Sequence, residues 1–488
     1  MKLVELLAGA EISGHSAGLD LDAEARGVSY DSRTCKRGDI FVAIRGMESD
    51  GHDHVTQALE RGAVCAVTDR ALPDGAPYIC VANTRAALAV ISANFFGNPA
   101  KKLRMIAVTG TNGKTTVTSL IKGIIERATG EKSGLIGTVR NMIGDEELRS
   151  DLTTPESYEL HGLLAKMAEH GCRYAVMEVS SHALELDRVY GMEFEVGVFT
   201  NLTPDHLDFH GTMEKYGEAK LRLFKQCRAG ALNLDDAFSR EIMRSSGLGK
   251  DSLRTFSAMS VEADLVAKRI RLFPDSTEFC ALTIGTLQTV RIGIPGMFSV
   301  HNALAAISAA MLLGIDIQAA AAALGECPGI MGRAEVVPTG RDYTVIIDYA
   351  HTPDALEKII TAMRQSARGR VVTLFGCGGD RDRAKRPLMG GIATRLSDFT
   401  VITTDNPRTE EPRAIIDDIL AGVDADSSRR AVIEDRREAI KWALASLRPG
   451  DVLILAGKGH ETYQVIGKEK THLDEREVVA EALAAAAC

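Results

Sequence analysis

The chain has 488 residues, of which 45% are hydrophobic and 25% are charged, and its formal net charge is −9. This length is too great for one hydrophobic core and predicts about two to four domains. The negative charge provides no general surface for a nucleic acid or an anionic membrane, so an anionic ligand would need local binding sites.

The first block, residues 1–102, predicts a small α/β domain. DIFVAI (39–44) and AVCAVT (63–68) are typical of strands, and HVTQALERG between them favours a helix. The segment GNPAKK (97–102) then breaks the pattern and is the predicted linker.

The second block, residues 103–332, alternates strands and helices. LRMIAVTG, YAVMEV (174–179) and VGVFTNL (196–202) are apolar runs typical of buried strands. The intervening helices have apolar residues at i, i+3, i+4 and i+7, namely Ile121, Ile124, Ile125 and Ala128, then Leu160, Leu163, Leu164 and Met167. This alternation predicts a doubly wound parallel sheet. Residues 252–294, beginning with SLRTFS, change to short strands without helices and predict an appended antiparallel patch. HNALAAISAAMLLG then returns to helix.

A loop rich in glycine and proline (325–342) leads into the third block, residues 333–488. YTVIIDY, RVVTLFG, FTVITT and DVLILAG predict strands that alternate with helices. Ile440, Ala443, Leu444 and Leu447 form the apolar face of the last predicted helix. The sequence therefore predicts an α/β protein of three domains, with a central P-loop-type sheet and a C-terminal Rossmann-like domain.

The cysteines, together with the lack of an apolar segment typical of a signal peptide or a membrane span, indicate the cellular compartment. Nine cysteines are scattered without a C-x-x-C pair, which favours free thiols in a reducing compartment over a disulfide framework. The start, MKLVELLAGAEISG, is too acidic and too short an apolar run for a signal peptide, and no window reaches the roughly 18 apolar residues of a membrane span. We expect a cytoplasmic monomer that binds no membrane and no nucleic acid.

The stretch AVTGTNGKTTVTSL (107–120) places a glycine turn between a strand and a helix. Backbone N–H groups at such a turn face an anion, Lys114 can reach the outer phosphates, and Thr115 can ligate Mg²⁺. A turn that merely caps a helix is the alternative, but G-K-T-T directly after a strand disfavours it. The spacing from Gly110 to Gly113 is two residues shorter than the common pattern, which separates this loop from kinases, GTPases and motor ATPases. The predicted nucleotide-binding residues of the loop are Gly110, Thr111, Asn112, Gly113, Lys114, Thr115 and Thr116.

Short motifs along the whole chain resemble those of the Mur ligases, which add amino acids to the peptide of the bacterial cell-wall precursor. Folylpolyglutamate synthetases have a similar loop. The motifs are TGTNGKTT, DSR (31–33), TTP (153–155), EVSSHAL (178–184), NLTPDHLDFHG (201–211), AK (219–220), HNALAA (301–306), GRAE (332–335), DYAHTP (348–353), DNPR (405–408) and GKGHE (457–461). The resemblance implies that the chain uses ATP and Mg²⁺ to add meso-2,6-diaminopimelate to the D-glutamate carboxylate of UDP-N-acetylmuramoyl-L-alanyl-D-glutamate, a UDP-muramoyl dipeptide.

The expected chemistry accounts for several residue types. A carboxylate becomes reactive towards an amine when the γ-phosphoryl group of ATP is transferred onto it, and bringing two anions together calls for a metal and cationic groups. The resemblance assigns Glu178 and His206 as metal ligands beside Thr115, at the carboxyl ends of strands where ligands gather. It implies that Lys220 is carbamylated, because an ammonium cannot bind magnesium; a surface lysine is the alternative. The predicted catalytic residues are Lys114, Glu178, His206 and Lys220, and Asp208 is expected only to structure its loop.

The resemblance also assigns residues around the nucleotide and the UDP substrate. Asn302 would lie near the adenine, and Arg333 and Asp348 would reach ATP, although a solvated Arg333 is the alternative. Ser32 matches the position that holds the uridine nucleotide, with Tyr30 packing nearby. The sugar and peptide would contact Thr153, Thr154, Ser180 and Arg188, hydroxyls and an arginine that suit a polyanion but that also occur as ordinary turn formers. Some relatives have glutamine where this chain has Leu186, which leaves that contact open.

DNPR lies on the loop after a predicted strand, and Arg408 offers a planar fork suited to a carboxylate. Diaminopimelate has one more carboxylate than lysine, so an arginine there would favour it and repel the lysine ammonium. Loss of such a charge pair should cost roughly 2–5 kcal/mol. Surface pairing of Arg408 with Glu410 or Glu411 is the alternative. The implied amino-acid pocket comprises Arg381, Asp405, Asn406, Pro407, Arg408, Gly457 and Glu461.

Two other functions remain open. One is the same reaction with another amino acid, either lysine or the glutamate added to folate; DNPR disfavours lysine, and DSR with TTP disfavours folate. The other is a nucleotide-binding regulator or ATPase switch, which would need neither the metal ligands nor an amino-acid pocket.

Overall fold

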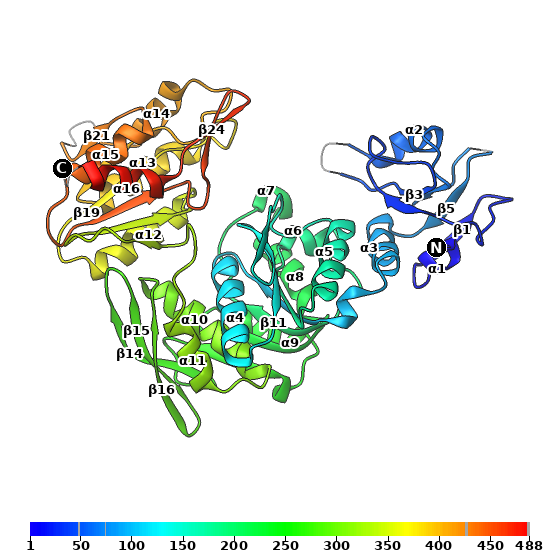
Figure 1. Ribbon diagram of the computed structural model, residues 1–488, viewed down its shortest axis with the longest axis horizontal. Helices are drawn as coiled ribbons and strands as arrows, with labels where there is room; N and C mark the ends of the chain where they lie inside the picture. Colours follow the sequence, from blue (N-terminus) through cyan, green and yellow to red (C-terminus); the bar gives the residue numbers. More distant parts are fainter. Residues whose placement is uncertain (47–48, 74, 425–427, 486–488) are drawn as a thin grey trace. The chain divides into compact units, whose positions relative to one another are not determined.

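The structure is a computed structural model that describes residues 1–46, 49–73, 75–424 and 428–485. It contains two compact units, of which the first comprises Met1–Leu265 with Ala305–Ala320. Figure 1 labels helices and strands along the chain. The second comprises Val266–Leu304 with Ala321–Cys488. The three predicted domains, with boundaries at 102/103 and 332/333, stay a prediction.

The N-terminal part of the first unit is a five-stranded sheet with the order β1-β5-β4-β3-β2. Its strands are β1 (Ile12–His15), β2 (Gly27–Ser29), β3 (Asp39–Val42), β4 (Cys65–Thr68) and β5 (Tyr78–Val81), and all are parallel except β1. α2 (Val55–Glu60) connects β3 to β4, and α3 (Thr84–Phe95) packs on the sheet together with the short α1 (Leu3–Leu6). The strands and the helix predicted for 39–68 are confirmed.

The central sheet has eleven strands, and from β13 onwards their order is β13-β12-β11-β6-β10-β7-β8-β9. These strands are β6 (Arg104–Thr109), β7 (Ser133–Ile136), β8 (Asn141–Ile143), β9 (Glu146–Leu148), β10 (Tyr174–Glu178), β11 (Phe194–Phe199), β12 (Cys227–Asn233) and β13 (Leu253–Ser257). The strands from β13 to β7 are parallel, as predicted, and β8 and β9 add an antiparallel edge that the sequence did not indicate. The main helices are α4 (Lys114–Thr129), α5 (Ser157–Glu169) and α8 (Met213–Phe224). The predicted apolar faces of α4 and α5 are largely buried.

The prediction for SLRTFS was wrong. β13, which contains this segment, pairs in parallel with β12 and is therefore part of the doubly wound sheet, not of an antiparallel patch. The reason is that α9 (Phe238–Ser245) lies between β12 and β13. The alternation of strands and helices therefore continues for one helix and one strand more than the sequence suggested. The strands that follow, β14 (Leu265–Leu272), β15 (Thr277–Thr283) and β16 (Thr286–Ile292), form the expected antiparallel meander. α10 (Met297–Leu312) matches the helix predicted after it.

The C-terminal sheet has the order β17-β18-β22-β19-β20-β21 and is parallel except for β17. Its strands are β17 (Glu335–Val337), β18 (Thr344–Asp348), β19 (Val371–Phe375), β20 (Phe399–Ile402), β21 (Arg430–Val432) and β22 (Val452–Ala456). The helices between them are α12 (Pro353–Ser366), α13 (Lys385–Leu396), α14 (Pro412–Leu420) and α15 (Arg436–Ala445). Because these strands are parallel, the loops after β19, β20 and β22 emerge at the same edge, where open α/β sheets bind ligands.

The predicted last helix is not the last. α15 is followed by the hairpin of β23 (Tyr463–Ile466) and β24 (Glu469–His472), and then by α16 (Glu475–Ala485). Leu447 lies beyond the end of α15 but packs against its core cluster, so the apolar contact that the pattern predicted is present although the helix is shorter.

The eight cysteines in the described ranges are all free, as predicted, and Cys488 lies outside those ranges. Among the residues that the structure covers, no helix combines the length and the apolarity needed to cross a bilayer.

Candidate active site

The glycine loop lies between the end of β6 and the start of α4. Gly110 has φ +147° and Gly113, the N-cap of α4, has φ +89°, both in the region that favours glycine. A Cβ at Gly110 would collide with Thr200 Oγ1, just after β11. The next residue, Asn201, fixes the loop because its carbonyl accepts a hydrogen bond from the Thr111 N–H at 2.8 Å. The residues after β11 thus fix the conformation of the loop, which leads directly into the N-terminus of α4.

Lys114 folds over this loop. Its Nζ donates to the carbonyl oxygens of Gly110 at 2.8 Å and Thr111 at 2.9 Å. The amine therefore lies above the backbone that is suited to cradle an anion, a position from which it can reach a bound phosphate. Thr115 and Thr116 are buried on the first turn of α4.

Glu178 ends β10 and faces the glycine loop. Its side chain is 1% exposed, and Oε2 accepts a hydrogen bond from Thr115 Oγ1 at 3.1 Å. Thr138, which follows β7, donates to the same carboxylate through its N–H at 2.8 Å and its hydroxyl at 3.0 Å. Thr153 contacts the Thr138 hydroxyl at 3.0 Å. The structure therefore brings together the carboxylate and the loop hydroxyl that the sequence assigned to a metal.

Lys220 is buried in α8, with 1% of its surface exposed, so the alternative of a surface lysine is wrong. Its Nζ lies 4.2 Å from the centroid of the Tyr216 ring, and the Tyr216 hydroxyl lies 3.1 Å from Thr111 Oγ1 in the glycine loop. Burial lowers the pKa of Lys220 well below its usual value, and the charge of Lys114 lowers it further. Lys220 therefore lies near the glycine loop, and the charge of Lys114 affects its protonation.

His206 adopts a left-handed conformation (φ +53°) immediately before α7 (Leu207–His210). Its ring lies edge-on to that of His182 with the centroids 4.7 Å apart, and burial lowers the pKa of His206 below its usual value. His182 follows the strand that ends in Glu178, and the sequence analysis gave it no role.

The donor set suits a hard divalent cation only in part. The Glu178 carboxylate and the Thr115 hydroxyl are oxygen ligands of the kind that Mg²⁺ prefers. Within the described ranges, no group of three or more His, Cys, Asp and Glu side chains is arranged to hold a metal. Thr115 and Glu178 are thus two predicted metal ligands that the structure brings into direct contact.

The residues predicted for the sugar and peptide lie next to Glu178. Thr154 Oγ1 donates to the Glu178 carbonyl at 2.9 Å and accepts the Ser180 N–H at 3.1 Å. Ser180 Oγ also caps α6 (Ser181–Glu185), and Arg188 donates to the Thr154 carbonyl at 2.9 Å. In the N-terminal sheet region, Ser32 Oγ donates to Gln57 at 2.7 Å. Tyr30 donates its hydroxyl to Glu159 at 2.9 Å.

Three residues predicted to contact ATP lie in the second unit. Asn302 is buried on α10. Asp348 ends β18, and its carboxylate accepts the N–H groups of Ala334 at 2.7 Å and Ala350 at 2.8 Å. Arg333 lies over the Tyr349 ring, 5.0 Å from its centroid. Asp348 therefore fixes the GRAE turn that presents Arg333.

The loops after β20 and β22 build a polar cluster around a buried lysine. Lys458 is 0% exposed and donates to Asn406 Oδ1 at 3.1 Å and to Glu461 Oε2 at 3.0 Å. Asn406 Nδ2 donates to the same Glu461 oxygen at 2.8 Å. Gly457 has φ +113°, and a Cβ there would lie 2.6 Å from Asp405 Oδ2. The structure thus brings Asp405, Asn406, Gly457 and Glu461 together around Lys458, and their role in binding an amino acid stays a prediction.

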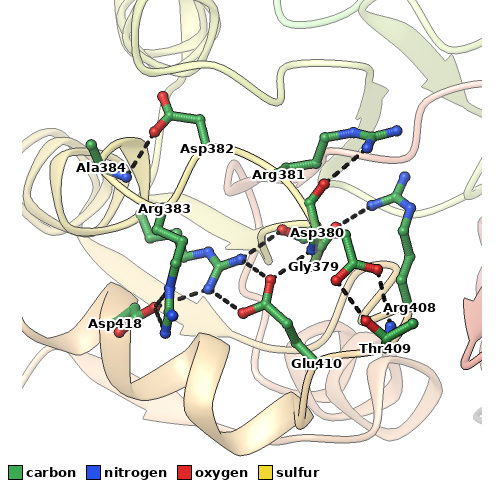
Figure 2. A network of polar contacts seen from close by, with 12 residues as sticks. Gly379, Asp380, Arg381, Asp382, Arg383, Ala384, Arg408, Thr409, Glu410 and Asp418 are labelled. Carbon is green, nitrogen blue, oxygen red and sulfur yellow. Dashed lines mark hydrogen bonds and ion pairs between the residues drawn. The ribbon is translucent and has the colours of Figure 1, made fainter. Parts of the chain in front are cut away.

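Arg408 and Arg381 come from the loops after β20 and β19 (Figure 2). Arg408 Nη1 donates to the Gly379 carbonyl at 2.7 Å, and Arg381 Nη1 donates to the Asp380 carbonyl at 2.9 Å. A Cβ at Gly378 would lie 2.9 Å from Arg408 Nη1 and 3.8 Å from Arg381 Cγ, so the two side chains flank this glycine. Pro407 packs its carbonyl against Gly379.

The alternative in which Arg408 pairs with Glu410 or Glu411 is wrong. Glu410 is held by the guanidinium of Arg386, at 2.7 and 2.9 Å. Arg408 instead donates to a backbone carbonyl, and among the residues that the structure describes no carboxylate forms an ion pair with it.

Three domain families of known proteins together match most of the chain. The Mur ligase middle domain matches residues 108–310, the Mur ligase glutamate ligase domain matches 332–459, and the Mur ligase family catalytic domain matches 24–96. The chain belongs to the Mur ligase family.

Individual relatives of this Mur ligase align over almost its whole length. It is 46% identical over 488 residues to the UDP-N-acetylmuramoyl-L-alanyl-D-glutamate–2,6-diaminopimelate ligase of Clostridium tetani, covering 99% of both chains. It is 45% identical to the protein of the same name from Caldanaerobacter subterraneus subsp. tengcongensis, again covering 99% of both. A solved structure of a ligase of that name superposes with a TM-score of 0.74 at 32% identity, over 100% of this chain and 99% of the other.

The structure of this Mur ligase adds residues to the site that the sequence analysis did not assign. Thr138 holds Glu178, Tyr216 joins α8 to the glycine loop, and Lys458 orders the amino-acid cluster. A lysine inside GKGHE was a visible signal for Lys458, but nothing in the sequence marked the other two.

Proposed function

We propose that this Mur ligase joins meso-2,6-diaminopimelate to the D-glutamate carboxylate of UDP-N-acetylmuramoyl-L-alanyl-D-glutamate, with ATP as the energy source. The observation that carries this proposal is the set of loops at one edge of the C-terminal sheet. They present two arginines, Arg381 and Arg408, and a carboxylate, Glu461, which suit the carboxylates and the ammonium of such an amino acid. The names of the full-length relatives support the same substrate.

The proposed reaction has two steps. In the first, an oxygen of the substrate carboxylate forms a bond to the γ-phosphorus of ATP, the bond from that phosphorus to the β-phosphate oxygen breaks, and ADP leaves. In the second, the diaminopimelate amine attacks the acyl carbon, loses a proton, and displaces phosphate that retains the former carboxyl oxygen. The first step brings two anions together, and the second develops negative charge on the acyl oxygen as the amine attacks. The rates of both steps therefore depend on groups that are arranged beforehand to stabilise the charge.

The residues around the glycine loop suit the first step. Lys114 and the N-terminus of α4 would stabilise the phosphoryl group, and Thr115 with Glu178 would hold Mg²⁺, which supplies charge neutralisation between the phosphates when bound. Thr153, Thr154, Ser180 and Arg188 are proposed to orient the sugar and peptide beside Glu178, and Ser32 with Tyr30 to hold the uridine nucleotide. Asn302, Arg333 and Asp348 stay predicted ATP contacts. The eight free cysteines in the described ranges support a reducing compartment, for which we propose the cytoplasm.

The amino-acid pocket accounts for the choice of amino acid. A fork from Arg408 would bind the carboxylate that distinguishes diaminopimelate from lysine, and the same positive charge would repel the ammonium at the end of a lysine side chain. Glu461, fixed by Lys458 and Asn406, would bind an ammonium of the incoming molecule.

The decisive experiment supplies ATP, Mg²⁺ and the UDP-muramoyl dipeptide labelled with ¹⁸O in its D-glutamate carboxylate. We expect release of phosphate that contains the label when diaminopimelate is present, and much less release when lysine replaces it. Phosphate release that does not depend on an amino acid would favour a nucleotide switch. Release without transfer of ¹⁸O would contradict the acyl phosphate.

We also propose that Lys220 carries a carbamate. Its buried position beside the phosphate loop and its lowered pKa favour the neutral amine, which is the form that adds CO₂. With ¹³C-labelled bicarbonate, the protein should show a carbamate signal in its NMR spectrum that is missing from Lys220→Arg. Identical spectra of the two proteins would contradict the modification, irrespective of activity.

A further inference from the structure

Arg386 is a fully buried arginine just behind the proposed amino-acid pocket. It lies in the first turn of α13 and its side chain is 0% exposed. Nη2 donates to Glu410 Oε1 at 2.7 Å, and Nη1 donates to Glu410 Oε2 at 2.9 Å, so the guanidinium and the carboxylate meet fork to fork. Nη1 also donates to Asp418 at 2.9 Å, and Nη2 to the Gly378 carbonyl at 3.2 Å. One side chain therefore contacts the loop after β19, the loop after β20, and α14.

Glu410 links Arg386 to Asp380, the residue that precedes Arg381. Its Oε1 also accepts the Asp380 N–H at 2.6 Å. The Asp380 carboxylate in turn accepts the Thr409 hydroxyl at 2.7 Å and the Thr409 N–H at 3.2 Å, which ties it to the residue after Arg408 (Figure 2). The two loops are thus cross-linked in both directions by side-chain-to-backbone hydrogen bonds.

Both loops contain backbone that needs such support. Asp380 and Arg408 each have φ +52°, in the left-handed region that side chains with a Cβ rarely adopt. Conformations of this kind persist where the surrounding contacts enforce them, and they gather at ligand sites. Arg381 directly follows the first of these residues, and Arg408 is the second. The two arginines that are proposed to bind the carboxylates of the amino acid therefore point in directions set by strained backbone. The hydrogen bonds of Arg386, Glu410 and Asp380 support this backbone.

We infer that Arg386 is a positioning residue for the carboxylate-binding loops and that it thereby controls discrimination between diaminopimelate and lysine. The inference rests on the proposed function. Arg386 acts through Glu410 and Asp380, because its own fork is used on Glu410, Asp418 and the Gly378 carbonyl. A lysine at this position would keep the charge but could not engage both Glu410 oxygens and Asp418 in one plane. The strained loops would then relax, and the two arginines would lose their fixed directions.

The test compares Arg386→Lys with Arg383→Lys in the full chain. Arg383 is the matched control because it is a neighbouring arginine that also bonds Asp418, at 3.1 Å, but is exposed and, in the part of the chain that the structure describes, forms no hydrogen bond or ion pair with Glu410. For Arg386→Lys we expect the KM for diaminopimelate to rise about tenfold or more, as for the loss of a charged hydrogen bond, with the KM for ATP changed less than about twofold. The ratio of kcat/KM for diaminopimelate over lysine should fall by a similar factor. Arg383→Lys should change none of these values appreciably.

A second pair of variants keeps the inference testable if Arg386→Lys does not fold. Glu410→Gln retains the shape of the side chain but weakens the fork, and it should produce the same rise in KM; Glu411→Gln, at an exposed neighbour, is its control. In the Arg408→Lys background, either change should have a smaller further effect than in the unaltered protein, because Arg381 is then the one pocket arginine left to misplace.

The outcomes separate the inference from the function on which it rests. If the unaltered protein joins no diaminopimelate, the proposed function fails. If it does, and folded Arg386→Lys or Glu410→Gln keeps both the KM for diaminopimelate and the discrimination against lysine, Arg386 is only a structural ion pair and the inference is overturned. A rise in the KM for ATP equal to that for diaminopimelate would overturn it as well, since a general loss of order would then explain both.

Discussion

Replacing Lys114 with methionine is expected to lower kcat roughly 100- to 1,000-fold, the loss typical of removing one preorganised group that stabilises a transition-state charge. Methionine keeps the length of the side chain but removes the ammonium that lies over the carbonyls of Gly110 and Thr111. The glycine loop itself is held by Asn201 and by the tight approach to Thr200, so its shape should survive the change. Steady-state kinetics with saturating substrates measures the effect.

The control for Lys114→Met lies in the same helix. Lys122 is buried in α4 and pairs with Glu126 at 2.6 Å, so Lys122→Met removes a lysine of the same helix, more buried than Lys114, at a position two turns from the glycine loop. We expect it to reduce stability but to leave kcat within about threefold, as for changes remote from a site. If both variants lost kcat equally, the role of Lys114 at the phosphates would be contradicted.

Arg408→Lys is the second substitution with a large expected effect. Lysine retains the positive charge but not the planar fork, so we expect a loss of about 2 kcal/mol in binding of diaminopimelate, equivalent to a roughly 30-fold rise in its KM. This is the lower end of the range for a broken charge pair because the ammonium still attracts the carboxylate. ATP binding should be nearly unchanged, because Arg408 lies on a loop of the C-terminal sheet and its hydrogen bond to Gly379 is within the proposed amino-acid pocket.

Calorimetric titration of ATP and steady-state kinetics for diaminopimelate separate the two readouts for Arg408→Lys. Arg413→Lys is a suitable comparison because Arg413 is an exposed arginine on the adjoining α14 that pairs only with Asp417, at 3.0 Å, among the contacts seen in the described part of the chain. An equal loss of ATP and diaminopimelate binding by Arg408→Lys would mean that Arg408 supports the fold and not the pocket.

Most of the fold could be predicted because the parallel sheets leave a strong pattern. Buried strands such as β6, β10 and β22 are continuous apolar runs, and α4 and α5 have apolar residues at helical spacing. SLRTFS was misassigned because one short strand has no periodicity that distinguishes parallel from antiparallel pairing. Whether β13 pairs in parallel with β12 depends on the segment that connects the two strands. This segment contains α9, which the sequence analysis did not recognise as a helix.

The site could be predicted only where a motif holds the residues together. TGTNGKTT, DNPR and GKGHE each carry adjacent residues to one place, so their grouping followed from the sequence. The burial of Lys220 could not be predicted, since one polar residue on an amphipathic helix is normally exposed. The contact of Arg386 with Glu410 was equally hidden, because the two residues are separated by a helix and a strand and only tertiary packing brings them together.

The close approach of Gly378 and Gly379 to the opposing loop limits how the choice of amino acid can be altered. Side chains at these positions would strike the Arg408 guanidinium or the Pro407 carbonyl, so neither loop can be reshaped while the other stays as it is. Redesign towards a substrate without a second acid group would therefore require a graft of both segments at once, together with their shared arginine–glutamate support. Intermediates that exchange one segment alone should bind neither the old amino acid nor the new one well.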